Sequence, residues 1–331
     1  MRELLPAPHR VTDAAGVPAF GSYRGAVSDV DFAPSPIERV LRQKRWVYVA
    51  LVSDPFYVGA AIVRMGYASK LFAFVYDARA RAIIGRASSM APALAAKVGR
   101  SSRAETVAAY RFGRDRARFG AEAGGRRSFE LHAGSVTVEA ELGEGPPEIT
   151  AVGRLTGGGR AEGRSLTEKG VLLPLSGRLR VLGVDHALDG FGAYDYTSGI
   201  LQRRTAWRWA FAMGRDTSGA PVAMNLVEGF MGEPECALFT ERDVHPVGEG
   251  RLVHQGGVDG PLGPWRVTTT CGAVALDFEP GAEHAEHTNL AVVKSAFHQP
   301  VGTFSGEVRA GGRTYTLRDV LGVTEDQSVV W

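Results

Sequence analysis

The chain has 331 residues, and its 38 Lys and Arg side chains nearly balance 36 Asp and Glu side chains, for a formal net charge of +2. This balance excludes a strongly basic nucleic-acid binder and an acidic solvating tail. The length is about twice the ~150-residue domain prior and predicts two domains. The 42 glycines exceed the usual ~7% without a collagen period, which indicates many tight turns between short strands.

The N-terminus holds no apolar stretch typical of a secretory signal, and no run approaches the ~18 apolar residues of a spanning helix. The two cysteines, Cys236 and Cys271, are too few for a disulfide scaffold or a four-thiolate zinc site. We therefore expect a cytoplasmic protein without a membrane span and with two buried free thiols. The sequence contains no signal for an oligomeric state.

Short strands dominate the first half of the chain. Period-two and apolar runs predict strands over 46–52, 56–63 and 71–76, and alternation from 129 to 140 predicts a hairpin that turns at 132–135. The stretch 88–98 is rich in Ala and Ser and is the best helix candidate of the chain. In that helix Ser89 would be the cap, and Pro92 would be tolerated only in the first turn.

A glycine-rich stretch from 156 to 164 is the most loop-like part of the chain, and it predicts domains over 1–160 and 161–331. Strand-like runs resume beyond it, at 171–175, 178–184, 205–213, 222–227, 237–241, 252–258, 265–270, 273–278, 289–297, 302–308 and 314–320. Several strands in each half favour antiparallel barrels or sandwiches over alternating βαβ units. The predicted fold class is all-β with a few short helices.

Two charged segments have a structural and a functional interpretation. Arginines outnumber acids from 100 to 127, which indicates a solvated face in an arginine-biased chain or, as the alternative, a phosphate or nucleic-acid surface. No RNA-binding aromatic signature accompanies them, and we expect no nucleic-acid partner. His284 and His287 form a possible metal pair, but no third ligand is visible, so a solvated loop and no bound metal are expected there.

The most informative segment runs from 185 to 210. Trp207 and Trp209 are two residues apart, so on a strand they share one face with Thr205, while Arg204 and Arg208 take the other face. The two indoles therefore either form a plate of the core or line an apolar cavity.

Asp195 lies between Tyr194 and Tyr196 in what looks like a glycine-rich turn. A carboxylate close to aromatic rings has its pKa raised by desolvation, which keeps it protonated for general-acid chemistry. The structural alternative is an ion pair with Arg203 or Arg204, or a hydrogen bond that stabilises the turn.

Asn225 and Glu235 are further polar groups on apolar segments. Buried polar groups must find partners, and a cavity that gathers several of them is the default location of a site.

The order and spacing of several motifs resemble the bacterial family labelled domain of unknown function 2804. These motifs span nearly the whole chain and are Lys44-x-Trp46-x-Tyr48, Gly66-Tyr67, Asp195-Tyr196-Thr197-x-Gly199, Thr205-x-Trp207-x-Trp209-Ala210, Asn225-Leu226, Glu235, Trp265, Phe278-x-Pro280, Gln299-Pro300-x-Gly302-Thr303-Phe304-x-Gly306, Gly322-x-Thr324-Glu325 and Trp331. Arg64 departs from the family pattern, which has an acidic residue before Gly66-Tyr67, so no role is carried over to that loop.

More remotely, the chain is similar to the tandem lipocalin-like group of carotenoid hydratases, tocopherol-cyclase-like proteins and Diels–Alderases. That likeness implies two lipocalin-like β-barrel or sandwich halves around an interface that receives an apolar small molecule. A shared fold does not determine the function.

The first functional hypothesis is an enzyme without metal or organic cofactor that hydrates, isomerises or cyclises an apolar or unsaturated small molecule, as a lyase or an isomerase. Asp195 would donate the proton, with Tyr196 or Glu235 as a second polar group. The substrate-binding candidates are Arg204, Trp207, Trp209, Asn225 and Gln299. The indoles would wall the cavity and stabilise positive charge, and Arg204, if it faces inward, would bind an oxyanion.

Three alternatives stay open at this stage. A lipophilic-ligand carrier would have the same cavity, with Asp195 ion-paired and structural. A glycoside-cleaving enzyme would use Asp195 and Glu235 as its two carboxylates beside aromatic platforms. A structural protein would have a filled core and no pocket. A protonatable carboxylate aimed into a cavity favours catalysis, and one neutralised by Arg favours binding.

Overall fold

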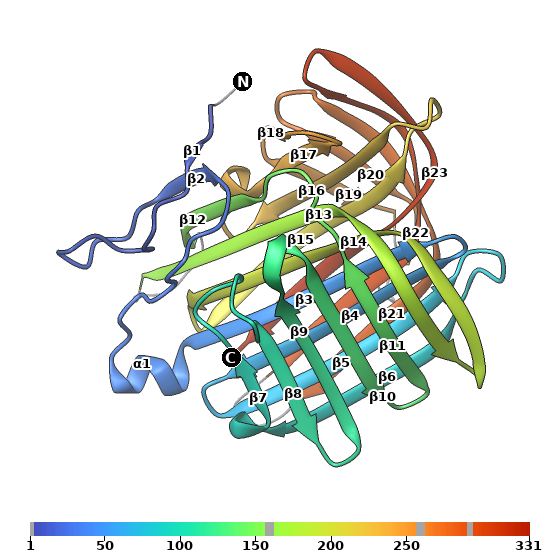
Figure 1. The fold of residues 1–331 in the computed structure, drawn as a ribbon. Coiled ribbons are helices and arrows are strands. Elements are labelled where there is room, and N and C mark those ends of the chain that lie inside the picture. Colours follow the sequence, from blue (N-terminus) through green and yellow to red (C-terminus); the bar gives the residue numbers. More distant parts are fainter. Residues whose placement is uncertain (1–2, 156–161, 256–261, 290–293) are drawn as a thin grey trace.

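The regular secondary structure of the described residues is almost entirely antiparallel β-strand, which confirms the predicted all-β class (Figure 1). The computed structural model describes residues 3–155, 162–255, 262–289 and 294–331. The strands form two curled sheets packed together. Besides the α-helix α1 (Pro36–Leu41), the described residues include three short 3₁₀ helices, η1 (Ala93–Ala95), η2 (Ala123–Gly125) and η3 (Glu233–Glu235). No helix among them is long and apolar enough to cross a bilayer.

The first sheet contains the strands up to residue 200. They are β1 (Leu5–Pro6), β2 (Gly21–Arg24), β3 (Gln43–Ser53), β4 (Phe56–Met65), β5 (Ala68–Asp77), β6 (Ala82–Pro92), β7 (Ala96–Val98), β8 (Ala108–Phe112), β9 (Asp115–Ala121), β10 (Arg127–Ala133), β11 (Val136–Leu142), β12 (Ile149–Leu155), β13 (Gly163–Val181) and β14 (Val184–Ile200). Their order is β6-β5-β4-β3-β14-β13-β11-β10-β9-β8-β7, and β12 joins β13 to β2, which pairs with β1 in parallel.

The second sheet begins after residue 203. Its strands are β15 (Arg204–Arg215), β16 (Pro221–Gly229), β17 (Ala237–Thr240), β18 (Val244–Pro246), β19 (Gly250–His254), β20 (Trp265–Thr269), β21 (Val274–Asn289), β22 (Lys294–Ala310) and β23 (Arg313–Val330). Their order is β18-β17-β16-β15-β23-β22-β21-β20-β19. The change of sheet thus falls at 201–203, and the predicted domain boundary between residues 160 and 161 lies outside the described residues.

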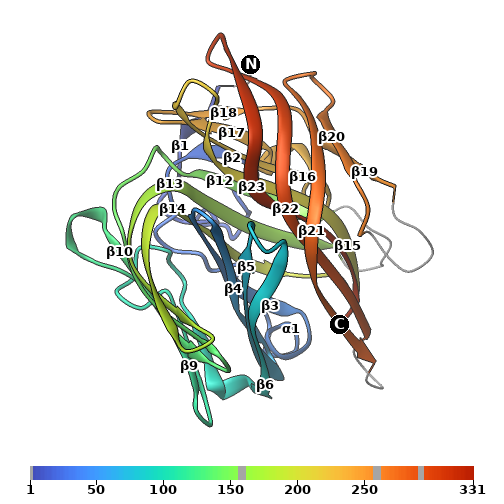
Figure 2. The ribbon, with the colours of Figure 1, turned by 90° about the vertical axis from the view of Figure 1, so that its right-hand side faces the viewer.

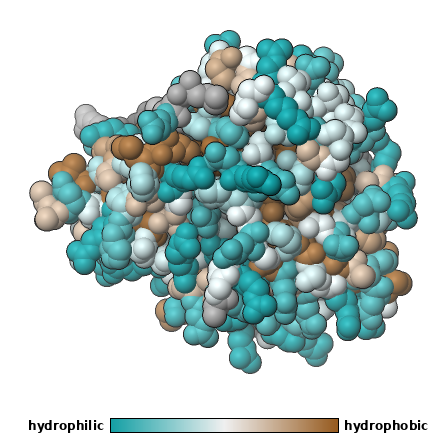
Figure 3. Space-filling view, turned by 45° about the horizontal axis from the view of Figure 1, so that its top comes forward, coloured by the Kyte–Doolittle hydropathy of each residue, from teal (hydrophilic) through white to brown (hydrophobic). Residues whose placement is uncertain are grey.

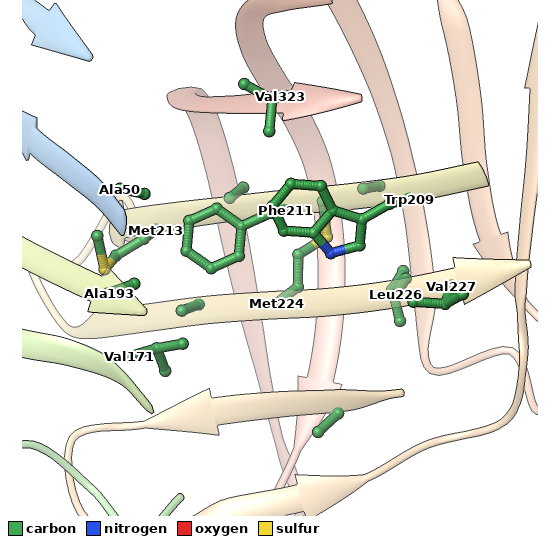
Figure 4. Close-up of a cluster of buried hydrophobic side chains, with 14 of the residues drawn as sticks. Ala50, Val171, Ala193, Trp209, Phe211, Met213, Met224, Leu226, Val227 and Val323 are labelled. Atoms are coloured by element: carbon green, nitrogen blue, oxygen red, sulfur yellow. The ribbon is translucent and has the colours of Figure 1, made fainter. Parts of the chain in front are cut away.

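Two apolar cores follow from this arrangement. One fills the inside of the first sheet, and the other fills the second sheet and the space between the sheets. Figure 2 shows β3 to β6 between the green strands of the first sheet and the orange strands of the second. Figure 4 shows Trp209, Phe211 and Met213 of β15 in the second core, near Ala193 of β14. The face seen in Figure 3 is mainly hydrophilic, with apolar residues in separate patches.

The strand predictions are confirmed in the first half, where β3, β4 and β5 cover the predicted runs and β10 pairs with β11 as the predicted hairpin. The predicted helix over 88–98 is wrong: this stretch forms the end of β6, η1 and β7. The end of β6 alternates, with Ala87 and Ala91 buried and Ser88 and Met90 exposed, and it pairs along β5. Sheet pairing therefore outweighs the high intrinsic helix propensity of Ala.

Three further expectations need correction. Cys236 is buried as expected, but Cys271 is exposed. Arg127 is buried and does not belong to a solvated basic face. The segment that carries His284 and His287 is part of β21 and not a solvated loop, and the His284 side chain is buried.

Candidate active site

A cavity of about 180 Å³ lies between the two sheets, and aromatic side chains supply much of its wall. Its lining includes the rings of Trp46, Tyr48, Phe72, Trp207, Trp209 and Phe297. A dry apolar cavity of ~150 Å³ holds benzene, so the present one has room for a ring or a branched hydrocarbon group.

Strand register explains how the first sheet builds its side of the cavity. One row of direct neighbours runs across β13, β14, β3, β4 and β5 through Lys169, Asp195, Tyr48, Ala61 and Phe72. A second row lies two residues further along each strand and contains Thr197, Trp46, Val63 and Lys70. Side chains two residues apart share a face, so both rows point into the cavity.

The second sheet provides the facing wall in the same way. Trp209 of β15 lies between Val227 of β16 and Glu325 of β23. One row further, Gln327 of β23 lies between Trp207 and Phe297. The prediction that Trp207 and Trp209 share a face is therefore confirmed, and that face forms part of the cavity wall.

Aromatic contacts join the two walls. Trp46 and Trp207 stack with ring centroids 6.3 Å apart and an interplanar angle of 8°. Tyr48 meets Trp209 edge to face at 5.4 Å. Trp209 also stacks on Phe211 at 5.6 Å, as seen in Figure 4, so this indole belongs both to the core and to the cavity wall. Such pairs are each worth ~0.5–1.5 kcal/mol beyond area burial, and they hold the sheets in register.

Lys169 is the central cation of the site. Its Nζ forms a hydrogen-bonded ion pair with Asp195 and lies 3.6 Å from Oε2 of Glu235. Burial by itself lowers the pKa of Lys169, but the facing carboxylates outweigh this effect and raise it. Lys169 is therefore a buried ammonium ion shared by two carboxyl groups.

Asp195 is held as an acceptor. Besides the ion pair with Lys169, its Oδ1 accepts hydrogen bonds of 3.0 Å from the hydroxyls of Thr167 and Thr197. It lies in β14, so its predicted place in a glycine-rich turn is wrong. Its cationic partner is a lysine across the β13–β14 pair and neither Arg203 nor Arg204.

Glu235 is buried at the end of η3 and faces the same cavity. Burial raises its pKa to about 7, with Lys169 opposing the rise and Asp195 adding to it. Its Oε1 has no hydrogen-bond partner among the described residues. A carboxyl group in this environment carries a proton for much of the time near neutral pH.

Glu325 is a second buried carboxyl group on the cavity wall, and burial also raises its pKa to about 7. Trp207 Nε1 donates to its Oε1 and Gln299 Nε2 to its Oε2, each at 2.7 Å. These two donors lower the pKa and favour the ionised form, in contrast to the bare oxygen of Glu235.

The structure brings together four of the predicted site residues, since Asp195, Glu235, Trp207 and Trp209 line one cavity. Two others support the wall from behind. Asn225 accepts from Trp209 Nε1 and donates to the carbonyl of Glu235, both at 2.8 Å, and Gln299 binds Glu325. Asn225 thus links the second indole to the backbone of the buried acid.

The other two candidates lie apart from the cavity lining. Tyr196 points to the opposite face of β14, is buried in the core of the first sheet, and donates to the carbonyl of Gly99 at 2.9 Å. Arg204 is exposed, because it lies on the opposite face of β15 from the indoles.

The sequence interpretation missed Lys169 and Glu325. Glu325 lies within one of the motifs that carry the family resemblance, and Lys169 is one of only five lysines, placed just before an apolar run. Both were detectable as charges on apolar strands. Lys169 meets Asp195, and Glu325 meets Trp207, only because the strands that carry them come together in the fold, and the sequence alone does not show this pairing.

The described residues contain no group of three or more His, Cys, Asp or Glu side chains placed to hold a metal ion. His284 packs against Phe72 and Phe74 with centroid distances of 5.0 and 5.2 Å, and burial lowers its pKa to about 4. It is therefore a neutral ring in an aromatic cluster.

Comparisons with known proteins agree with the fold. The family model described as "Domain of unknown function (DUF2804)" matches residues 2–331. Among solved structures, CghA with Sch210972 is similar at a TM-score of 0.58 and 10% identity, covering 98% of this chain and 97% of that one. Kievitone hydratase from Nectria haematococca has a TM-score of 0.50 and 10% identity, covering 99% and 98%. Among curated proteins, no sequence matches this chain.

Proposed function

The chain belongs to the DUF2804 family, and we propose that it is an enzyme that performs acid–base chemistry on an apolar, unsaturated small molecule. The reaction would be a hydration, an isomerisation or a cyclisation. The single observation that carries this proposal is Glu235, a buried carboxyl group with a pKa of about 7 on the wall of an aromatic cavity. The fold shared with kievitone hydratase and CghA is consistent with this general kind of activity.

We assign the proton donor to Glu235, although the sequence favoured Asp195. Asp195 accepts from two threonines and a lysine, a set of partners that stabilises a carboxylate. Glu235 is more deeply buried, and desolvation favours its neutral form. A general acid works best when its pKa lies near the working pH, and the pKa of Glu235 meets this condition.

The reaction balances without an oxidant or reductant. The Glu235 carboxyl gives its proton to one carbon of a substrate double bond, and the electrons of that bond form the new C–H bond. The cation on the other carbon then takes one of three courses: it accepts water and the added oxygen loses a proton, it loses a proton from a neighbouring carbon, or a second double bond attacks it to give a new cation that in turn loses a proton. In each course the Glu235 carboxylate takes up the released proton. The rings of Trp207 and Trp209 stabilise the cation by ~0.5–2 kcal/mol each.

The role of Lys169 follows from its position. Its positive charge keeps the pKa of Glu235 from rising further, so that the carboxylate left after proton transfer is stabilised. The same cation neutralises Asp195, and a cavity carboxylate that is already neutralised favours a binding protein. A carrier of lipophilic molecules is therefore the second candidate function, and the test has to separate it from catalysis.

The test uses a panel of aryl-substituted alkenes and α,β-unsaturated ketones incubated with the protein in D₂O. Mass spectrometry of the recovered compounds should show deuterium incorporation or addition of D₂O for at least one member with the wild type and none with Glu235→Gln. Binding of each compound is followed in parallel by quenching of tryptophan fluorescence. Binding without deuterium incorporation in either protein would support the carrier, and neither binding nor incorporation would oppose both functions.

A further inference from the structure

Exposed apolar side chains gather around one end of the cavity. They are Ile37, Val40, Leu41, Tyr67, Met90 and Leu94, here called the apolar rim. They make up six of the thirteen large apolar side chains that are exposed in the described residues, so their clustering is the main departure from an otherwise polar surface. In Figures 1 and 2, α1, the end of β6 and the C-terminus all lie in the lower part of the molecule.

The rim is continuous although its members come from α1, the turn between β4 and β5, the end of β6, and η1. The turn between β4 and β5 packs on α1 so closely that a Cβ at Gly66 would lie 2.1 Å from the carbonyl oxygen of Val40. On the other side of this turn, Ala68 pairs with Pro92, two residues before Leu94. The helix, the turn that carries Tyr67, and η1 thus form one edge.

The helix in this rim is attached through its backbone and not through its apolar face. Lys44 Nζ donates to the carbonyl of Leu41 at 2.8 Å and lies between the rings of Tyr67 and Trp331, at 4.9 and 5.3 Å. A helix of a globular protein normally buries its apolar stripe. None of the residues of α1 is buried, and its i, i+3, i+4 set of Ile37, Val40 and Leu41 faces outward.

The rim borders the opening of the cavity. Met90 is half exposed and lines the cavity, as does Trp331, whose ring also contacts Lys44. A ligand that crosses the rim therefore meets apolar atoms on the way to Trp46 and Trp207.

The exposed charges beside the rim are basic, and the cavity-lining acid Glu286 is ion-paired with Lys70. Arg39 of α1 and Lys97 of β7 are exposed. The one acidic side chain of the helix, Glu38, is already bound by the Ser35 cap and by Arg42. Exposed apolar side chains flanked by cations are typical of a surface that inserts shallowly into an anionic lipid interface.

We propose that the apolar rim binds the surface of an anionic lipid bilayer, from which an apolar ligand enters the cavity. A bilayer fits better than a protein partner, because a folded partner seated on the rim would close the opening that Met90 borders. A bilayer also dissolves the kind of molecule that the aromatic lining accepts. This inference goes beyond the proposed function and does not depend on its chemistry.

The test is co-sedimentation with vesicles of phosphatidylglycerol and phosphatidylcholine, compared with vesicles of phosphatidylcholine alone. The wild type should bind the anionic vesicles, and the double variant Val40→Asp/Leu94→Asp should bind them at least about tenfold more weakly. The matched control is Leu182→Asp/Val253→Asp, which places the same charges at exposed apolar positions of the β13–β14 turn and of β19 and should bind like the wild type.

Each other result has a defined meaning. Absence of wild-type binding, or equal loss in the rim variant and its control, would overturn the proposal. A dimer in analytical ultracentrifugation that only the rim variant dissociates would assign the rim to a second copy of the chain. Glu235→Gln should bind vesicles like the wild type, so that a failure of the proposed chemistry and a failure of the membrane contact are told apart.

Discussion

Two buried charge clusters lie back to back on the same pair of strands. Lys169 and Asp195 point into the cavity between the sheets, whereas their chain neighbours Glu168 and Tyr194 point into the core of the first sheet. In the second cluster, Tyr194 donates to Glu168 at 2.6 Å and accepts from Arg127 at 2.8 Å. We call these groups the cavity cluster and the core cluster.

The difference between the clusters lies in what surrounds their charges. In the core cluster the guanidinium of Arg127 stacks on Tyr194 at 4.1 Å and lies 3.6 Å from Glu148. Each cluster has a buried carboxyl oxygen without a hydrogen-bond partner among the described residues, Oε2 of Glu168 and Oε1 of Glu235, but only Glu235 lines the cavity. Buried charges thus do not mark a site by themselves, and the open volume beside them separates function from structure.

The largest expected loss of stability comes from a substitution in the core cluster. Replacing Arg127 with Leu removes the buried guanidinium that pairs with Glu148 and donates to Tyr194, which costs about 3–5 kcal/mol of unfolding free energy. Urea denaturation measures this loss. The control Arg126→Leu alters the exposed neighbour and should change stability by less than about 0.5 kcal/mol. Equal stability of the two variants would show that the core cluster does not stabilise the fold.

Removal of the cation in the cavity cluster should lower the unfolding free energy by less than the Arg127 replacement does. Lys169→Met leaves Asp195 and Glu235 facing each other, but water can enter the cavity, so we expect a loss of about 2–3 kcal/mol at pH 8. Without Lys169, which lowers the pKa of Glu235, that pKa rises above about 7. The folded state then binds more protons than the unfolded state, and the loss should shrink as the pH falls toward 5. A penalty independent of pH would contradict this role.

The sequence predicted the face of β15 but not the composition of the clusters. Period two is a local property, so the shared face of Trp207 and Trp209 follows from their spacing. Which strand lies beside β14 is a non-local property, and it decides that Asp195 meets Lys169. Tyr196 was predicted to belong to the site, but it lies outside the cavity. Adjacent residues of a strand point to opposite faces, so Tyr196 faces the core of the first sheet while Asp195 faces the cavity.

Glu235→Gln should increase stability, in contrast to the two previous variants. The pKa of Glu235 is about 7 in the folded protein against an ordinary value of 4.5, so ionisation costs the folded state stability as the pH rises between these values. The amide does not ionise, and the variant should gain about 3 kcal/mol at pH 8 and nothing at pH 4. Thermal unfolding at both pH values measures the gain. Glu233→Gln, an adjacent change outside the cavity lining, should show no such difference, and a gain at pH 4 would contradict the assignment.

The smallest expected change in stability comes from replacing the two indoles of the cavity wall. The two replacements distinguish stabilisation of a charge from packing, because only one of the indoles binds a carboxyl group. Trp207 donates to the carboxylate of Glu325, whereas Trp209 donates to the amide of Asn225. Because the Trp207 hydrogen bond lowers the pKa of Glu325, Trp207→Phe should raise that pKa above about 7 and cost about 1 kcal/mol. Trp209→Phe should leave the titration of Glu325 in place. Carboxyl ¹³C NMR of glutamate-labelled protein follows both variants, and equal titration curves would show that Glu325 is governed by burial alone.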